Sequence, residues 1–353
     1  MVESRDISQI DKMDIKNFPL DVLESFMTGL GEKPYRAKQV MQGIYKHNRS
    51  SFSQISAIPR PVRERLEEVY YIGKLNLEDI KISKDGTQKY LFVLEDGNKM
   101  ESVLIPERDY LTLCISTQVG CAQRCYFCLT GKRGFTRNLS TSEIVNQILA
   151  VRERIKEASK LTNIVLMGMG EPLANYHNTL HALRIITSSH GLSFSKRRVT
   201  LSTAGLAPQI EMLGKDIDIN LAVSLNAADN ETRSFLMPIN QKYPIEKLIK
   251  TCKSYPLPPR RRITFEYVLI RGVNDSERHA YRLTKLLRGI RCKINLIPLN
   301  EHPWLKFRRP SAKTILRFQK ILMDSHYTAL IRESRGSDIQ AACGQLYGAR
   351  EGL

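Results

Sequence analysis

Short apolar segments alternate with helix-period segments through residues 111–332, and this alternation restricts the fold more than any other feature. The apolar segments are 111–116, 163–167, 198–202, 219–224, 263–270 and 293–298. The helical segment 140–157 starts with a capping box, Ser140 with Glu143, and continues with a buried stripe of Ile144, Ile148, Val151 and Ile155. Strands that alternate with helices pair in parallel. We therefore predict an α/β fold, a partial (β/α)6 barrel, with a further strand at 328–332.

The residues before this alternation have a different pattern. Helical apolar spacing predicts three helices within 1–72, one with the face Leu23, Phe26, Met27 and Leu30, and two that begin near Pro34 and Pro59. The dipeptides Asp85-Gly86 and Asp96-Gly97 are hairpin-turn sequences between β-rich runs. We therefore predict an N-terminal helical accessory domain at 1–72, a connecting β-hairpin segment at 73–106, a barrel at 107–335 and a C-terminal segment at 336–353.

Polar residues follow several of the predicted parallel strands. Barrel enzymes place their active sites at these carboxyl ends. The residues are Gly170, Glu171, Ser202, Ser224, Leu225, Asn226 and Asn300. A single polar strand end is usually structural, and the run Met167-Gly-Met-Gly-Glu-Pro172 could equally be a glycine-rich turn. Their shared position predicts one site at this edge.

Three cysteines follow the first parallel strand with the spacing C-x3-C-x2-C: Cys121, Cys125 and Cys128. Three thiolates can hold three irons of a cubane and leave the fourth iron open for a ligand. A structural zinc site is the alternative, but it needs a fourth ligand at close spacing, and the next histidine is His177. Incidental cysteines are a second alternative. The spacing favours an iron–sulfur cluster.

The chain carries 54 Lys and Arg against 36 Asp and Glu, a net charge of +18. This excess favours a polyanionic partner such as RNA, although each basic run, at 196–198, 260–262 and 308–309, could be only a solvated face. The seven cysteines are an odd number, and the N-terminal stretch lacks the apolar core of a secretory signal. No apolar run is long enough to span a membrane. We expect a cytoplasmic protein without a disulfide framework.

Several longer segments resemble the RlmN/Cfr family of radical-SAM RNA adenine methyltransferases, over about residues 15 to 348. The matching segments are Glu101-Ser-Val-Leu-Ile-Pro-Glu, Cys114-Ile-Ser-Thr-Gln-Val-Gly-Cys121, Gly134-Phe-Thr-Arg-Asn-Leu139, the Gly-Met-Gly-Glu-Pro run, Ile263-Thr-Phe-Glu-Tyr267, Asn295-Leu-Ile-Pro-Leu-Asn300 and the segment around Cys343. The resemblance implies a radical-SAM barrel.

The family pattern implies the cofactors and their ligands. Cys121, Cys125 and Cys128 would hold a [4Fe–4S] cluster, and S-adenosyl-L-methionine (SAM) would bind its open iron. Two SAM molecules would be used per turnover. The SAM-binding positions carried over are Gly170, Glu171, Ser202, Ser224, Leu225, Asn226 and Asn300. The family usually has Ser-Leu-His at 224–226, and the asparagine of this chain can still form hydrogen bonds.

The resemblance also implies the reacting residues. Cys343 would accept a methyl group, and the methyl carbon would become a radical that adds to adenine. Glu101 matches the family's base, and Cys114 matches the cysteine that closes a disulfide with Cys343 to release the product. In isolation, Cys114 and Cys343 would be taken for inert cysteines, as we take Cys252 and Cys292.

In the family, the target is C2 of one adenosine of 23S rRNA, reached before the ribosome is fully assembled, and in many members also the adenosine beside the anticodon of some tRNAs. The reaction would require an external electron donor such as flavodoxin. We expect no membrane partner. Two alternatives stay open. One is C8 methylation of the same adenosine, as in the Cfr branch, and the other is a metal-stapled RNA-binding protein without catalysis.

Overall fold

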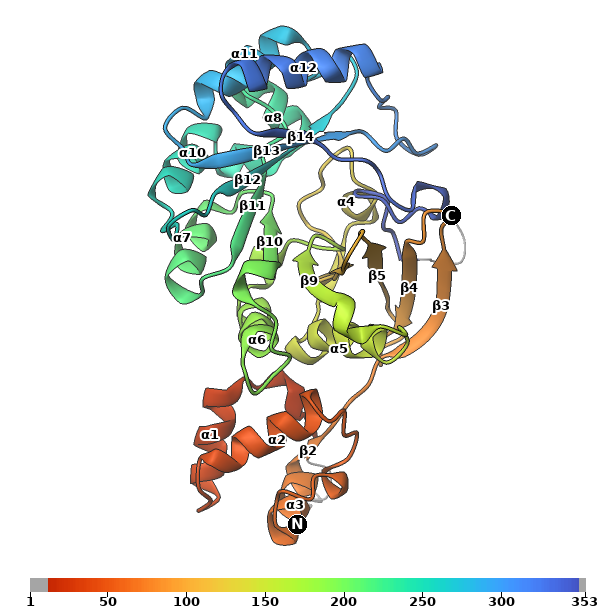
Figure 1. The fold of residues 1–353 in the computed structure, drawn as a ribbon, viewed down its shortest axis with the longest axis vertical. Coiled ribbons are helices and arrows are strands. Elements are labelled where there is room, and N and C mark those ends of the chain that lie inside the picture. Colours follow the sequence, from red (N-terminus) through yellow and green to blue (C-terminus); the bar gives the residue numbers. More distant parts are fainter. Residues whose placement is uncertain (1–11, 349–353) are drawn as a thin grey trace, which may run out of the picture. The chain divides into compact units, whose positions relative to one another are not determined.

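One ten-stranded sheet organises the computed structural model, which describes residues 12–348 (Figure 1). Its strand order is β14-β13-β12-β11-β10-β9-β6-β5-β4-β3. Residues 1–11 and 349–353 lie outside the described part of the chain. They include much of the N-terminal stretch without a secretory signal and the end of the predicted segment 336–353.

The six strands predicted from alternation are present and pair in parallel, with a seventh parallel strand at the edge. They are β6 (Leu111–Cys114), β9 (Leu161–Leu166), β10 (Val199–Thr203), β11 (Asn220–Ser224), β12 (Ile263–Leu269), β13 (Cys292–Pro298) and β14 (Ala329–Ile331). The edge strands β14 and β3 do not pair with each other within the described residues, so the sheet is an open one. The predicted α/β fold with a partial barrel is confirmed.

Three antiparallel strands extend the same sheet beyond β6. They are β3 (Asn76–Ile82), β4 (Gln88–Val93) and β5 (Lys99–Pro106). Both predicted hairpin turns form: Gly86 and Gly97 have φ values of 83° and 77°, which favour glycine, and Asp85 and Asp96 accept backbone N–H bonds within their turns. Because β5 pairs with β6, this segment continues the barrel sheet and does not form a separate layer.

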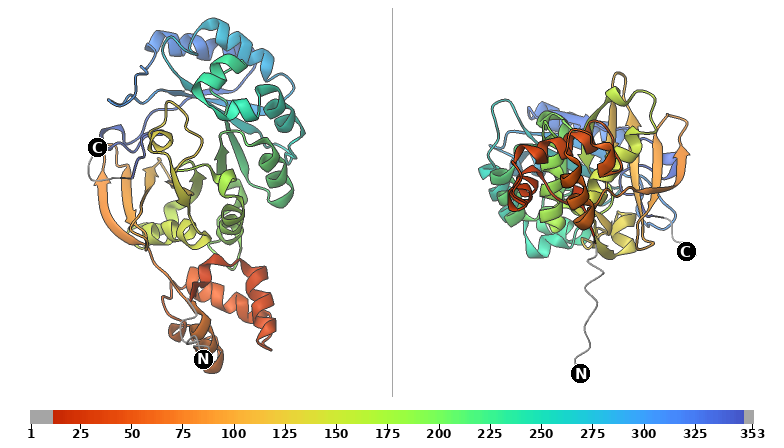
Figure 2. Two further views of the ribbon diagram at one scale, coloured as in Figure 1. Left: turned by 180° about the vertical axis from the view of Figure 1, so that it is seen from behind. Right: turned by 90° about the horizontal axis from the view of Figure 1, so that it is seen from below.

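Helices cover one face of the parallel strands (Figures 1 and 2). They are α7 (Ala207–Asp216), α8 (Asn230–Leu236), α9 (Ile239–Lys242), α10 (Ile245–Ser254), α11 (Glu277–Leu286) and α12 (Ala312–Asp324). The Tyr267 ring of β12 lies 5.3 Å from the Phe318 ring of α12. Since neighbouring residues of a strand face opposite ways, Glu266 faces the uncovered side of the sheet. That side carries the polar groups described below.

The described residues divide into two compact units, and the first joins residues 12–75 with 140–154 and 177–194. It contains α1 (Leu20–Gly29), α2 (Tyr35–Tyr45), α3 (Arg60–Val69), α5 (Thr141–Arg152) and most of α6 (Tyr176–Thr187), with the short strands β1 (Met13–Asp14) and β2 (Tyr70–Tyr71). Leu23, Met27 and Leu66 are buried in it. The accessory unit thus includes two helices that come from the barrel part of the sequence.

The helix predicted at 140–157 is shorter than expected. The capping box of Ser140 and Glu143 forms, and the predicted stripe is buried as far as Val151. The helix ends at Arg152, however, and Ile155 lies beyond it, only half-buried. Most of residues 152–157 are Arg, Glu or Lys, which favour helix, so local propensity did not predict that the helix ends at Arg152.

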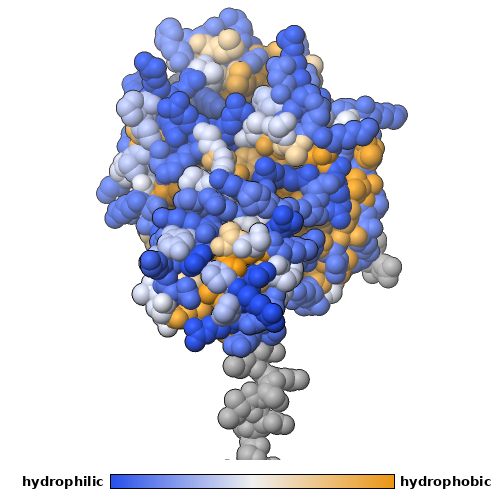
Figure 3. Space-filling model, turned by 60° about the horizontal axis from the view of Figure 1, so that its bottom comes forward, coloured by the Kyte–Doolittle hydropathy of each residue, from blue (hydrophilic) through white to orange (hydrophobic). Residues whose placement is uncertain are grey.

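No helix among residues 12–348 has the length and apolarity that crossing a membrane requires. The face drawn in Figure 3 is mostly hydrophilic, with smaller apolar areas between.

Candidate active site

The three cysteines lie on a loop that its own hydrogen bonds hold in place. The loop follows β7 (Gln118–Gly120), which pairs with β8 (Phe135–Asn138), and leads into α4 (Leu129–Arg133). Cys121 N–H donates to Gly134 O at 2.8 Å, and Tyr126 N–H donates to Leu236 O at 3.0 Å. A Cβ at Gly120 would lie 1.8 Å from Gly134 O, so only glycine fits there.

The thiols of Cys121, Cys125 and Cys128 influence one another electrostatically. Burial raises the pKa of Cys121 to about 12 and raises the pKa of Cys125 well above its ordinary value, and Cys128 adds to both shifts. None of the three forms a disulfide. These thiols would become thiolates in this setting only with a strong positive partner such as a metal centre.

This donor set fits a [4Fe–4S] cluster better than one zinc ion. In a cubane each thiolate binds a different iron, so the sulfurs need not converge on one point. A structural zinc ion requires such convergence. Within residues 12–348, no three His, Cys, Asp or Glu side chains converge on a position for a single ion. The described side chains around this loop therefore do not form a ready-made site for a single ion.

A buried arginine that the sequence did not reveal lies within electrostatic range of Cys125. Arg233, on α8, is fully buried and donates to Ala204 O at 2.6 Å, Leu225 O at 3.1 Å and Asn240 Oδ1 at 3.1 Å. None of the described acidic residues forms an ion pair with it. Burial lowers its pKa to about 10, and Cys125 opposes that shift. A buried cation without a carboxylate favours negative charge at the cluster loop.

Gly170 and Glu171 follow β9, as predicted, and their local geometry is tightly fixed. Gly170 has φ of 98°, and a Cβ there would lie 2.5 Å from the Gln118 side chain. Glu171 is buried and accepts from Ala204 N–H at 2.6 Å and from Leu173 N–H at 3.0 Å. Burial raises the pKa of Glu171 to about 7, and these two N–H bonds oppose the shift. Such a carboxylate is well placed to gain from a cationic ligand.

Ser202 and Ser224 are half-buried at the carboxyl ends of β10 and β11. Ser224 pairs in register with Glu266, and Glu266 with Asn295, so these three residues form one row across neighbouring strands. Leu225 follows Ser224 and is fully buried. The structure therefore brings the predicted serines to one edge, the same edge that holds Glu171.

Asn226 is the predicted SAM residue whose side chain has least freedom. It is buried with φ of 57°, in the left-handed region where asparagine is tolerated. Its Oδ1 accepts from Val268 N–H at 2.8 Å, and its Nδ2 lies 3.2 Å from Met237 Sδ. The side chain is therefore engaged within the protein, and so is the backbone carbonyl, which accepts from Asn274 Nδ2 at 2.8 Å.

The C-terminal segment returns to this edge and carries Cys343 with it. Asn300 Nδ2 donates to Cys343 O at 3.1 Å, and Leu129 N–H donates to Gly344 O at 2.8 Å. Thr130 Oγ1 donates to Leu346 O at 2.6 Å. Asn300 therefore holds the Cys343 backbone, a role that its motif did not indicate.

Cys343 and Cys114 lie within electrostatic range of each other. Cys114 ends β6 and is buried, whereas Cys343 is exposed to solvent. Surrounding protein raises the pKa of Cys343 to about 11, with Glu266 and Cys128 as further causes. Burial raises the pKa of Cys114 above its ordinary value, and Cys343 adds to the shift. The two predicted cysteines are 229 positions apart in the sequence, yet Cys114 lies within the electrostatic influence of Cys343.

Glu101 is buried under the C-terminal segment. Its Oε1 lies 2.9 Å from Lys89 Nζ, and its Oε2 accepts from the N–H groups of Tyr347 at 2.8 Å and Gly348 at 2.9 Å. Both charged side chains are more than nine-tenths buried. The predicted base is therefore engaged by three donors, and Lys89 is a partner that the sequence did not indicate.

Glu266 and Asn295 lie in the same row as Ser224, and their sequence motifs did not single them out for this site. Asn295 Nδ2 donates to Glu266 Oε1 at 2.9 Å, while Asn295 Oδ1 is buried without a hydrogen-bond partner. Burial raises the pKa of Glu266. Each of the two is a polar residue within a mostly apolar parallel strand, and the two strands are neighbours. This pattern could have identified them from the sequence.

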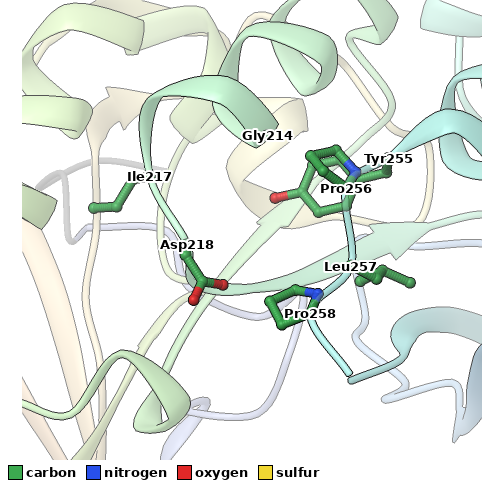
Figure 4. A pocket seen from close by; sticks show the side chains of 7 residues that line it. All are labelled: Gly214, Ile217, Asp218, Tyr255, Pro256, Leu257 and Pro258. Carbon is green, nitrogen blue, oxygen red and sulfur yellow. The ribbon is translucent and has the colours of Figure 1, made fainter. Parts of the chain in front are cut away.

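A separate cavity of about 420 Å³ lies at the opposite ends of the strands (Figure 4). Asp218 and Pro258, which line it, precede β11 and β12. The cavity thus opens at the amino ends and does not include any predicted site residue.

Comparison with known proteins agrees with this arrangement. Residues 115–284 match the Radical SAM superfamily, and residues 13–72 match the ribosomal RNA large subunit methyltransferase N-terminal domain. A radical SAM methyltransferase from Sphaerobacter thermophilus has the same fold, with a TM-score of 0.88 and 43% identity over 96% of this chain and 100% of that chain. The fold and the three-cysteine loop therefore define a radical SAM methyltransferase. Membership of this superfamily implies a [4Fe–4S] cluster and SAM.

Two relatives are each named dual-specificity RNA methyltransferase RlmN. The one from Syntrophus aciditrophicus is 51% identical over 96% of this chain and 97% of its own length. The one from Desulfosudis oleivorans is 56% identical over 89% of this chain and 85% of its own length. This chain belongs to the RlmN family.

The Lys89–Glu101 pair gives a stability prediction. Lys89→Met leaves a buried carboxylate without its cation, which typically costs about 3–5 kcal/mol. We expect the free energy of unfolding in urea to fall by that order. The double variant Lys89→Met/Glu101→Leu removes both charges and should recover much of the loss. A single variant as stable as the wild type would show that the ion pair does not support this region.

Proposed function

We propose that this chain methylates C2 of an adenosine in RNA, with Cys343 as the methyl carrier. The observation that carries the proposal is that the C-terminal segment brings Cys343 within electrostatic range of Cys114 and Cys128. A methyl carrier must reach both the SAM site and a second thiol. The names of the RlmN relatives support RNA as the substrate class.

The cluster and SAM would bind at the edge described above. Cys121, Cys125 and Cys128 would hold the cluster, and Gly170, Glu171, Ser202, Ser224, Asn300 and the backbone of 225–226 would bind SAM. When bound, these groups supply methyl cations and a carbon radical, with two SAM molecules consumed per turnover. The raised pKa of Glu171 supports its part, because a buried carboxyl near neutrality gains its charge when an ammonium group approaches.

Cys343 would accept the methyl group on its sulfur. Its thiol holds its proton near neutral pH, since its pKa is raised to about 11. Arg332 opposes that shift, so positive charge near this sulfur favours the thiolate that a nucleophile requires. C2 of adenine is not nucleophilic, which is why a carrier cysteine is needed. The carbon radical that SAM supplies would remove one hydrogen atom from this methyl group, and the resulting methylene carbon would bond to C2. The adduct would then lose one electron to the oxidised cluster, and it would lose the proton of C2.

Glu101 would accept the proton that leaves C2. In the structure, each of its oxygens already accepts a bond, from Lys89 on one side and from two backbone N–H groups on the other. The C-terminal segment thus covers one oxygen of the carboxylate and Lys89 the other. For Glu101 to contact a substrate proton, we infer that residues 347–348 move away from it during turnover.

Cys114 would release the product. Its thiolate sulfur would attack the Cys343 sulfur and form a disulfide, and the bond from that sulfur to the methylene carbon would break. The electron pair of the broken bond would stay with that carbon, which would take up a proton and become the methyl group of the product. An external reductant then restores both thiols. We propose 23S rRNA, before ribosome assembly is complete, and some tRNAs as substrates, and a protein such as flavodoxin as the electron donor.

The position of the methyl group decides between this function and C8 methylation. The test uses cells that lack their own methyltransferases of this family and express this enzyme in their place. We expect mass mapping of their rRNA and tRNA to find 2-methyladenosine. Detection of 8-methyladenosine would contradict the proposal. If the enzyme cleaves SAM but the RNA stays unmodified, RNA methylation is excluded as its function.

The carrier role predicts the effect of Cys343→Ala. This variant should lose both RNA methylation and S-methylation of the protein, because the only methyl acceptor of the site is gone. Mass spectrometry of the protein and of the RNA measures both. Cys252→Ala is the matched control, since Cys252 is a buried thiol on α10. Methylated RNA from Cys343→Ala would exclude the carrier role.

The release role predicts a trapped adduct. Cys114→Ala should retain the covalent bond between Cys343 and RNA, because no second thiol can displace the Cys343 sulfur. Denaturing gels should show a slower protein band that ribonuclease treatment converts to a smaller adduct. Free methylated RNA at the wild-type rate would remove Cys114 from the mechanism.

A further inference from the structure

Three aromatic side chains lie next to one another: Tyr126 on the cysteine loop, Phe235 on α8 and Phe307 on the loop after β13. The Tyr126 ring lies 6.1 Å from the Phe235 ring, and the Phe235 ring lies 6.1 Å from the Phe307 ring. Tyr126 and Phe235 are 57% and 52% exposed. We call Tyr126, Phe235 and Phe307 the aromatic rim. Exposed rings that contact one another in this way mark an interaction surface more often than a solvated one.

The aromatic rim rests on a packed base. Phe307 packs on a buried apolar cluster at the carboxyl ends of the strands, and Cys125 and Phe127 pack on the same cluster. The bond from Tyr126 N–H to Leu236 O ties the cysteine loop to α8. The rings are therefore presented by rigid elements, and they adjoin the proposed cluster site.

Exposed cations lie on the cysteine loop and on the loops after β12 and β13. They are Arg124, Arg271, Lys306 and Arg309, and none forms an ion pair with an acidic residue in the described range. Arg271 N–H donates to Arg308 O at 2.9 Å, which joins the loops after β12 and β13. Asp275 and Glu301 lie on these two loops and accept backbone N–H bonds there. The four cations outnumber these two carboxylates, so positive charge is available to a phosphate backbone.

Aromatic rings interleaved with uncompensated cations match one kind of partner. Unpaired nucleotides stack their bases on aromatic side chains while Arg and Lys neutralise the phosphates, and stacking tolerates any base. A paired duplex hides its bases and could use only the cations. A base that reacts inside the barrel must itself leave its stack, which leaves its neighbours unpaired at the rim.

We propose that the aromatic rim is a stacking surface for the unpaired nucleotides that flank the target base. This inference rests on the proposed function for the identity of the target, but it concerns binding, which is measured without catalysis.

The test compares two labelled RNAs with the same number of phosphates, a hairpin with an unpaired adenosine-containing loop and a blunt duplex. Fluorescence anisotropy measures their dissociation constants for the full chain with its reconstituted cluster. For Tyr126→Ala/Phe235→Ala we expect about a tenfold or greater loss of affinity for the hairpin. Duplex affinity should change less than about twofold, since the cations remain. Tyr126→Phe should bind the hairpin like the wild type.

Two controls separate the rim from general effects. Tyr281, on α11, is 51% exposed, and Tyr281→Ala should leave both affinities unchanged. Arg124→Gln/Arg271→Gln should weaken both RNAs and reduce the salt dependence of binding. Iron content and melting temperature establish that each variant keeps its cluster and fold.

Several outcomes would overturn the inference. Hairpin affinity that is unchanged in the double variant excludes stacking at the rim, and an equal loss for the duplex assigns the rim to non-specific binding. If the double variant instead slows only flavodoxin-driven SAM cleavage and keeps its RNA affinity, the rim binds the acidic electron donor. Methylation assays run in parallel keep the two proposals apart. The wild-type protein could bind the hairpin through the rim and still not methylate RNA. That result would refute only the proposed function.

Discussion

The return of the C-terminal segment to the sheet is the constraint on which the site depends. Residues 343–348 are bonded to the loop after β13, to α4 and to β5, through Asn300, Thr130 and Glu101. Without these bonds Cys343 would lie on a chain end, far in sequence from every other site residue. The bonds involve backbone groups of the segment, so they fix its path whatever side chains it carries. A carrier thiol can thus be positioned by secondary contacts while its own sulfur stays free to react.

The carboxyl ends of the parallel strands carry buried charges that the protein alone does not balance. Arg233 is buried beside the cysteine loop without a carboxylate, and Glu171 is buried without a cation. Each isolated charge opposes folding unless something of the opposite sign occupies the site. Thiolates on a metal centre and an ammonium group are such partners. The buried charges of Arg233 and Glu171 are therefore opposite in sign to the groups that the family is expected to bind.

Local sequence was sufficient for the elements and for the edge at which the site lies. The alternation of strands, the turn dipeptides and the capping box each depend on neighbouring residues, and each formed as predicted. The pairing of Lys89 with Glu101, the burial of Arg233 and the engagement of the Asn226 side chain could not be predicted. These depend on contacts between residues far apart in the chain or on hydrogen bonds to backbone atoms, which no side-chain pattern records. The early end of the helix at Arg152 belongs to the same class, because composition there still favours helix.

The buried pair of Lys89 and Glu101 also bears on how variation at these positions should be interpreted. Replacing either residue alone leaves a buried charge without its partner and destabilises the fold. Evolution must therefore pass through an unstable single variant or replace both residues together. Selection for folding would then preserve the glutamate even in a descendant that had lost its chemistry. Invariance of Glu101 among relatives would therefore be uninformative about proton transfer, and only a homologue with both positions replaced could separate architecture from catalysis.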